Sequence, residues 1–137
     1  MAHMGTEEAI RAIATDVYRK VGSGFNEPVY HRSMEVGLRL RGIKYQSERL
    51  VEVIYADHCV GEGYADLVVG DGEDAIVVEL KATAGELGRN ERQQVRNYME
   101  RLGAKKGLLI NFQKLGDARG ATADLKFSDV FPEDSEE

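Results

Sequence analysis

Apolar side chains recur every three or four residues in three stretches of this 137-residue chain, and this spacing predicts three amphipathic helices. The first covers Thr6–Val21. The second begins after Asn26, a favourable N-cap residue, and runs to about Arg41, while the third covers about residues 86–102. A glycine follows each stretch, as expected just beyond the end of a helix.

Strand patterns fill most of the remaining chain. The predicted strands cover residues 43–47, 50–56, 60–69, 75–82, 106–112 and 125–130. Asp71-Gly72 indicates an antiparallel hairpin between the third and fourth strands. Residues 106–112 are almost all apolar, which is typical of a buried strand. The order ααββββαββ, with a helix before that buried strand, predicts an α/β fold with a central mixed β-sheet flanked by helices.

The composition indicates a globular protein, with 42% hydrophobic and 31% charged residues in a length that suits one domain. No apolar run approaches the roughly 20 residues that cross a bilayer, and no signal peptide is visible. We therefore expect a cytoplasmic protein without a membrane partner. Cys59 is the only cysteine, which excludes an intramolecular disulfide and a cysteine-based zinc cluster.

The two ends of the chain differ from its body. Residues 1–5 are expected to be a cloning remnant, residues 6–131 the single domain, and residues 132–137 a solvated acidic tail. The net charge is −6, of which the tail contributes four acids and no base, so the rest carries −2. This balance argues against a generic nucleic-acid coat. It is compatible with a metal-dependent nuclease, because a bound metal supplies local positive charge.

Two neighbouring predicted strands carry ionisable residues where a core strand would carry valine. Asp66 lies on one strand, and Glu79 and Lys81 share a face of the next, because side chains alternate along a strand. Antiparallel pairing can place Asp66 beside Glu79, where two carboxylates repel unless a proton or cation lies between them. This pattern predicts a site for a hard cation such as Mg²⁺. The alternative is an amphipathic sheet with Glu79 and Lys81 facing solvent.

The helices add polar groups at helical spacing. Residues 24–30 read G-x-x-E-x-x-Y and open the second helix, where Glu27 and Tyr30 share a face. Glu27 would also suit this position simply as a negative charge at a helix N-terminus. On the third helix, Gln94 and Tyr98 lie one turn apart. A row of arginines on that helix is either a solvated face or a contact for a DNA backbone: Arg89, Arg92 and Arg96.

Five motifs in this order resemble the GxxExxY proteins of bacteria and archaea, which are assigned to the PD-(D/E)xK nuclease-like superfamily. The motifs are G-x-x-E-x-x-Y at 24–30, YADLVV at 64–69, VELKA at 78–82, QVRNY at 94–98 and GLLINF at 107–112. The likeness covers about residues 6–112. It implies a restriction-endonuclease-like core and a Mg²⁺- or Mn²⁺-dependent nuclease that hydrolyses phosphodiester bonds of DNA. The strand with Asp66 lacks the proline of the superfamily's name, as is common among its members.

The resemblance also implies roles for individual residues. The implied metal ligands are Asp66, Glu79, the carbonyl of Leu80 and Glu27. Lys81 becomes the catalytic lysine, and Gln94 would orient Lys81 or a phosphate, so the implied catalytic set is Glu27, Asp66, Glu79, Lys81 and Gln94. Tyr30 and Tyr98 would support the site.

The sequence also allows interpretations other than a metal-dependent nuclease. The acidic balance favours a non-catalytic module on the same fold that binds nucleic acid or a protein. A homodimer is a further expectation, because duplex cleavage needs two cuts. A cysteine or zinc enzyme built on His58 and Cys59 is rejected, because adjacent strand residues point to opposite faces. His31, alone on its helix, is predicted to be a surface residue.

Overall fold

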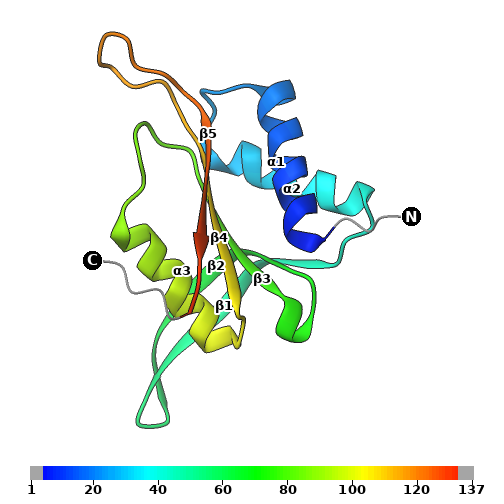
Figure 1. Ribbon diagram of the computed structural model, residues 1–137. Helices are drawn as coiled ribbons and strands as arrows, with labels where there is room; N and C mark the ends of the chain where they lie inside the picture. Colours follow the sequence, from blue (N-terminus) through cyan, green and yellow to red (C-terminus); the bar gives the residue numbers. More distant parts are fainter. Residues whose placement is uncertain (1–4, 133–137) are drawn as a thin grey trace.

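A computed structural model describes residues 5–132 of the protein and arranges them as helices on both faces of one sheet (Figure 1). The elements are α1 (Thr6–Val21), α2 (Glu27–Leu40), β1 (Tyr45–Tyr55), β2 (His58–Val69), a 3₁₀ turn η1 (Gly72–Asp74), β3 (Ile76–Lys81), α3 (Arg89–Leu102), β4 (Lys106–Phe112) and β5 (Leu125–Val130). Residues 1–4 of the expected remnant (1–5) and residues 133–137 of the expected acidic tail (132–137) lie outside the described residues.

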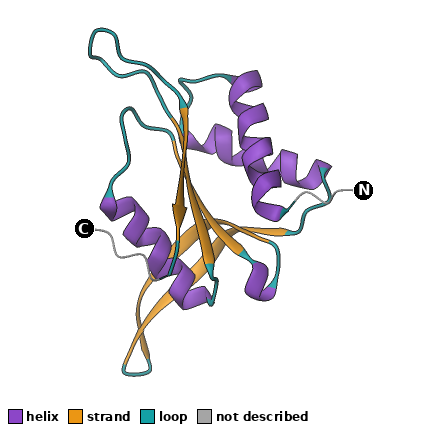
Figure 2. Ribbon diagram, viewed as in Figure 1, coloured by secondary structure: helices purple, strands orange, loops and turns teal. Residues whose placement is uncertain are grey.

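The sheet is mixed, with strand order β1-β2-β3-β4-β5. Strands β3 and β4 are parallel, and the other neighbouring pairs are antiparallel. Helix α3 connects the parallel pair and covers one face of the sheet, while α1 and α2 cover the other (Figure 2). The predicted α/β fold with a mixed sheet flanked by helices is therefore confirmed. None of the described helices has the length and apolar character needed to cross a membrane.

The prediction of two separate strands at residues 43–47 and 50–56 is wrong, because both belong to the single strand β1. Pairing with β2 continues on both sides of the predicted break, from Ser47–Leu67 to Arg49–Ala65. Glu48 lies at that break with a φ of 51°, in the left-handed region that non-glycine residues seldom occupy. The predicted break is therefore at the right position, but it is a bend within one strand and not a loop between two strands. The element order is ααβββαββ.

Helix α3 begins at Arg89, three residues after the predicted start. The backbone N–H of Gly88 donates to Glu91 Oε1 at 2.7 Å, and α1 begins in the same way, with Gly5 N–H donating to Glu8 at 3.2 Å. In each case the glutamate side chain satisfies a donor just before the helix, which is half of a capping box. This contact fixes the first turn of each helix.

Strand β3 is buried on both faces because helices pack against both sides of the sheet. Val78 and Leu80 face the core formed with α1 and α2, and Val77 faces the core formed with α3. Glu79 lies in this strand and is only 4% exposed. The interpretation of Glu79 as a solvent-facing residue of an amphipathic sheet is therefore wrong. A charged group in such a strand requires a specific partner.

Helices α1 and α2 approach closely at Gly37, where an added Cβ would collide with Ile13 Cγ2. Alanine is the better helix former by about 1 kcal/mol, but overpacking costs about 1–3 kcal/mol. We therefore expect Gly37→Ala to lower the free energy of unfolding in urea. Gly116→Ala is the control, because its Cβ would lie at ordinary distances of 3.6 and 3.7 Å from Ala121 and Ala84. A Gly37→Ala variant as stable as the wild type would contradict the prediction.

Candidate active site

Strands β2 and β3 separate where the two central acids lie. Their ladder pairs Val69–Ile76, Val68–Val77 and Leu67–Val78. One position further, Glu79 Oε2 accepts a hydrogen bond from the backbone N–H of Asp66 at 2.7 Å. Asp66 Oδ2 in turn accepts from the backbone N–H of Leu80 at 2.7 Å. Each carboxylate thus satisfies a backbone donor of the opposite strand, and the crossed pair holds both acids between the strands.

The regular alternation of β2 is interrupted at Asp66. Ala65 and Val68 both pack in the core beneath α3, although they are three residues apart. A regular strand would place Asp66 on the same face as Val68. Instead, a carboxylate oxygen of Asp66 lies within 4.8 Å of ligand atoms of Glu27 and His31 on α2. The irregularity therefore lets Asp66 reach the helix on the other face of the sheet.

Tyr30 fixes the start of α2. Its hydroxyl donates to the Gly22 carbonyl at 2.7 Å and accepts from the Phe25 N–H at 3.3 Å. Its ring stacks on Phe112 of β4 with a centroid distance of 4.5 Å. Because Glu27 is the first residue of this helix, the buried tyrosine determines where that carboxylate lies.

This geometry gives the G-x-x-E-x-x-Y pattern a structural meaning. Gly24 has a φ of 102°, which favours glycine, and Tyr30 ties the turn to the core. We expect Tyr30→Phe to lower the free energy of unfolding by about 1 kcal/mol, since two backbone groups lose a partner. Tyr55→Phe, at an exposed tyrosine, is the matched control. Equal thermal stability of both variants would contradict this role of the hydroxyl.

His31 is buried, with 8% of its surface exposed, so the prediction of a surface residue is wrong. Its Nε2 lies 2.9 Å from Ser47 Oγ, and Ser47 Oγ donates to Glu35 Oε2 at 3.2 Å. Its Nδ1 lies 3.5 Å from Glu27 Oε2. The sequence did contain a signal for this arrangement, because Glu27, His31 and Glu35 follow one another at intervals of four residues on one helix face.

The surroundings raise the pKa of all three carboxylates of the site, Glu27, Asp66 and Glu79. Burial raises the pKa of Glu79 to about 8, and the charge of Asp66 adds to this effect. Burial also raises the pKa of Asp66. The pKa of Glu27 is raised by burial and by the charge of Asp66. The ammonium of Lys81 opposes all three shifts. A site with this electrostatic character favours a proton or a cation.

Tyr98 approaches the acids from α3. Burial raises the pKa of its hydroxyl, as do the charges of Glu79 and Asp66, against the effect of a hydrogen bond to the Tyr64 backbone. A Cβ added at Gly63 would lie 2.6 Å from the Tyr98 hydroxyl oxygen, so the two elements are in close contact. Tyr98 thus packs against the strand that carries Asp66.

The other predicted residues of α3 lie on its more exposed surface. Gln94 and Arg89 are exposed, and Arg92 is half-buried. Arg96 donates from Nε to the carbonyl of Phe131, the residue after β5, at 3.1 Å. The roles of Gln94 and of the arginines stay predictions.

Two buried amides on and just after β4 fix the chain that follows Lys81. Asn111 pairs with Lys81 in the β3–β4 register. Its side chain accepts from Thr83 N–H at 3.1 Å and donates to the Thr83 and Gly85 carbonyls at 3.3 and 3.2 Å. Gln113 donates to the same Gly85 carbonyl at 2.8 Å. Neither amide was predicted as a site residue, although two amides at the end of an apolar run are an available signal.

Glu48 is a further acid near the site that was not predicted from the sequence. Its charge contributes to raising the pKa of Asp66, and its left-handed backbone conformation carries strain of about 1–3 kcal/mol, as often occurs at functional sites. A pocket of about 280 Å³ opens between α2, β1 and β2 at this point. It is lined by Glu27, Pro28, His31, Arg32, Glu35, Ser47, Glu48 and Asp66.

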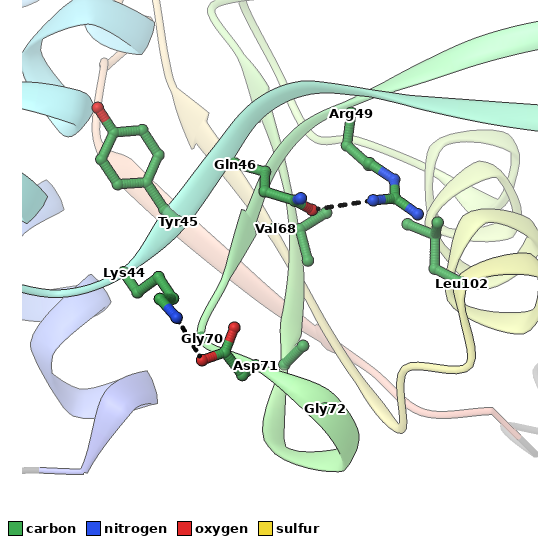
Figure 3. Close-up of a pocket in the computed structure, with 10 residues that line it drawn as sticks. Lys44, Tyr45, Gln46, Arg49, Val68, Gly70, Asp71, Gly72 and Leu102 are labelled. Atoms are coloured by element: carbon green, nitrogen blue, oxygen red, sulfur yellow. Dashed lines mark hydrogen bonds and ion pairs between the residues drawn. The ribbon is translucent and has the colours of Figure 1, made fainter.

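A second pocket, of about 470 Å³, lies at the start of β1 and beside the turn after β2 (Figure 3). Lys44 forms an ion pair there with Asp71 at 3.2 Å, and Arg49 donates to Gln46 at 3.2 Å. Neither of these pairs includes a predicted site residue. Two of the predicted site residues, Glu27 and Asp66, line the smaller pocket beside α2 instead.

Comparison with known proteins identifies the family. The family model of the PD-(D/E)XK nuclease superfamily matches residues 5–122. The chain belongs to the PD-(D/E)XK nuclease superfamily. A crystal structure of SSO0001 aligns with 76% of this chain and 50% of its own, with 18% identity and a TM-score of 0.57. That likeness supports the fold expected of a PD-(D/E)XK nuclease, and the chain spans half the length of SSO0001. A search of curated proteins gave no match.

Proposed function

We propose that this member of the PD-(D/E)XK superfamily is a Mg²⁺- or Mn²⁺-dependent nuclease of the GxxExxY group that hydrolyses phosphodiester bonds of DNA. The main support is the crossed arrangement of Asp66 and Glu79 within a buried part of the sheet. Burial raises the pKa of both carboxylates, and the charge of Asp66 raises that of Glu79 further; buried charges of this kind destabilise a fold. Such an arrangement is expected where the charge serves chemistry.

The donor atoms of the site fit a hard divalent cation. Glu27 and Asp66 are close to each other and to His31, and Asp66 is linked to Glu79. Carboxylate and carbonyl oxygens are the ligands that Mg²⁺ prefers and that also suit Mn²⁺. We assign the ion to Asp66, Glu79, the Leu80 carbonyl and Glu27. When bound, it would neutralise phosphate charge and lower the pKa of a coordinated water.

The chain's own side chains would position the substrate. Lys81 follows Glu79 by two residues on β3, and its ammonium would hold a phosphate oxygen or the attacking water. There it would stabilise negative charge that develops on the phosphate oxygens. Gln94 would orient Lys81 or the phosphate. On α3, Arg89, Arg92 and Arg96 would contact the DNA backbone without reading its sequence.

Incubation with plasmid and oligonucleotides in Mg²⁺, Mn²⁺ or EDTA tests the proposal. We expect cleavage with either ion and none in EDTA, and a loss of at least about 10²-fold in Lys81→Met, since Lys81 stabilises transition-state charge. Lys105→Met is the control, because Lys105 is exposed and forms an ion pair with Glu73 at 2.8 Å. Cleavage that persists unchanged in Lys81→Met would remove the assignment. Calorimetry without ion binding at millimolar concentration would favour the non-catalytic binding module.

A further inference from the structure

We infer that His31 is a metal ligand in this protein, acting through Nδ1 beside Glu27 and Asp66, and that its imidazole makes the site prefer Mn²⁺ over Mg²⁺. The inference rests on the proposed metal-dependent function, and it adds a ligand and an ion preference to it. It is carried by the hydrogen bonds on one side of the ring and the carboxylates on the other.

The hydrogen bonds on the Nε2 side assign the tautomer of the neutral ring. The Ser47 hydroxyl has one proton, which it donates to Glu35 at 3.2 Å. It must therefore accept from the His31 Nε2–H, which lies 2.9 Å away. With the proton on Nε2, the lone pair of the neutral imidazole is on Nδ1.

The Nδ1 side of the ring faces acceptors. Glu27 Oε2 lies 3.5 Å from Nδ1, and one ligand atom from each of Glu27, His31 and Asp66 lies within 4.8 Å of the others. Adjacent ligands of one hard cation lie roughly 3–4 Å apart, so the spacing is suitable. Two carboxylates and a nitrogen lone pair in a half-buried site need a positive charge among them.

The surroundings of the ring match those of metal-bound histidines in general. Such a histidine donates its second ring N–H to a carboxylate, carbonyl or water that fixes its orientation. Here the Ser47 hydroxyl takes that place and passes the interaction to Glu35. Glu35 is itself held by the Tyr45 hydroxyl at 3.0 Å. The chain of contacts from β1 thus orients a ring that is only 8% exposed.

The imidazole is expected to strengthen the binding of Mn²⁺ more than that of Mg²⁺. Mg²⁺ takes oxygen ligands and gives up its waters reluctantly, so a nitrogen ligand adds little to its binding. First-row transition ions accept imidazole more readily, and among them Mn²⁺ also suits carboxylate ligands. A site of two or three carboxylates and one histidine is therefore expected to select Mn²⁺.

Calorimetric titration of the metal-free protein tests the preference. His31→Gln is expected to weaken Mn²⁺ binding by about 10-fold or more, while Mg²⁺ binding changes by less than about threefold, since Mg²⁺ depends on the oxygen ligands. His58→Gln is the matched control, because His58 is exposed at the start of β2, and it should leave both affinities unchanged. Equal Mn²⁺ affinity of His31→Gln and wild type would overturn the inference, as would equal weakening of both ions.

Pulsed EPR of bound Mn²⁺ tests the ligand directly. The wild type and His58→Gln should show coupling to an imidazole ¹⁴N nucleus, and His31→Gln should not. Bound Mn²⁺ without nitrogen coupling in the wild type would overturn the role of His31 and leave the proposed nuclease intact. A wild type that binds neither ion would instead overturn the proposed function.

Ser47→Ala provides a second variant at an exposed position, should His31→Gln fail to fold. It keeps the imidazole but removes the hydroxyl 2.9 Å from Nε2, which leaves Glu35 Oε2 at 3.5 Å as the nearest acceptor. We expect Mn²⁺ binding about 10-fold weaker, with the ¹⁴N coupling retained. An unchanged Mn²⁺ affinity would contradict the orienting hydrogen-bond chain.

Discussion

Asp66→Asn is expected to reduce the proposed metal-dependent DNA cleavage by at least about 10³-fold, as for residues that act within one catalytic unit. The substitution removes the negative charge that faces Glu27 and His31. The asparagine carbonyl oxygen can still accept from the Leu80 N–H, which the aspartate accepts at 2.7 Å. The expected result is therefore a folded protein without activity.

The comparison with Asp66→Ala separates chemistry from folding. Alanine leaves the Leu80 N–H without a partner at the point where β2 and β3 separate, which costs about 1–3 kcal/mol. Cleavage rates and thermal unfolding should be measured for both variants. Asp16→Asn is the control, because Asp16 forms a surface ion pair with Lys20 at 3.4 Å. Cleavage at the wild-type rate by Asp66→Asn would exclude Asp66 from the active site.

Without metal, the protein is expected to lose stability as pH rises from about 5 to 8. Burial and the charge of Asp66 raise the pKa of Glu79 from 4.5 to about 8 in the folded protein. Between these values the folded state holds a proton that the unfolded chain has released. The stabilising contribution is thus complete below pH 4.5 and is lost as pH rises through about 8, on the order of 2–4 kcal/mol.

Urea denaturation in EDTA at several pH values measures this slope. Glu79→Gln should flatten the profile, because the amide does not titrate and its oxygen can still accept from the Asp66 N–H. Glu100→Gln, at an exposed position on α3, should keep the wild-type slope. Added Mn²⁺ should stabilise the wild type more at pH 8 than at pH 5, since the ion binds the deprotonated carboxylates. Parallel profiles for the wild type and Glu79→Gln would contradict the prediction.

The helices could be predicted closely because their signals are local. Apolar periodicity and a following glycine gave both ends of α1, and the N-cap signal gave the start of α2. The sequence indicated a break near Glu48, but it has no local signal for the pairing with β2 on both sides, which keeps β1 one strand around a φ of 51°. The loop predicted there was consequently wrong.

The site was only partly predictable for a similar reason. Antiparallel pairing of two strands is enough to bring Asp66 and Glu79 together, so their proximity could be predicted from the sequence. His31 was predicted wrongly as a surface residue because its ring contacts Ser47 of β1, an element distant in sequence. The interruption that turns Asp66 toward α2 is likewise a tertiary feature, since Ala65 and Val68 show no break in the apolar pattern.

The crossed carboxylates at the separation of β2 and β3 also constrain how this protein could evolve. Each acid accepts a hydrogen bond from a backbone N–H of the opposite strand, as a peptide carbonyl would. A relative that had lost the proposed catalysis could therefore not freely replace them with apolar residues. Asparagine and glutamine preserve these hydrogen bonds and discard the charge. We therefore expect degenerate, inactive relatives to retain amides at positions 66 and 79. An uncharged polar residue at these positions would then indicate only that the backbone hydrogen bonds are kept. Two carboxylates together with Lys81 would indicate an active enzyme.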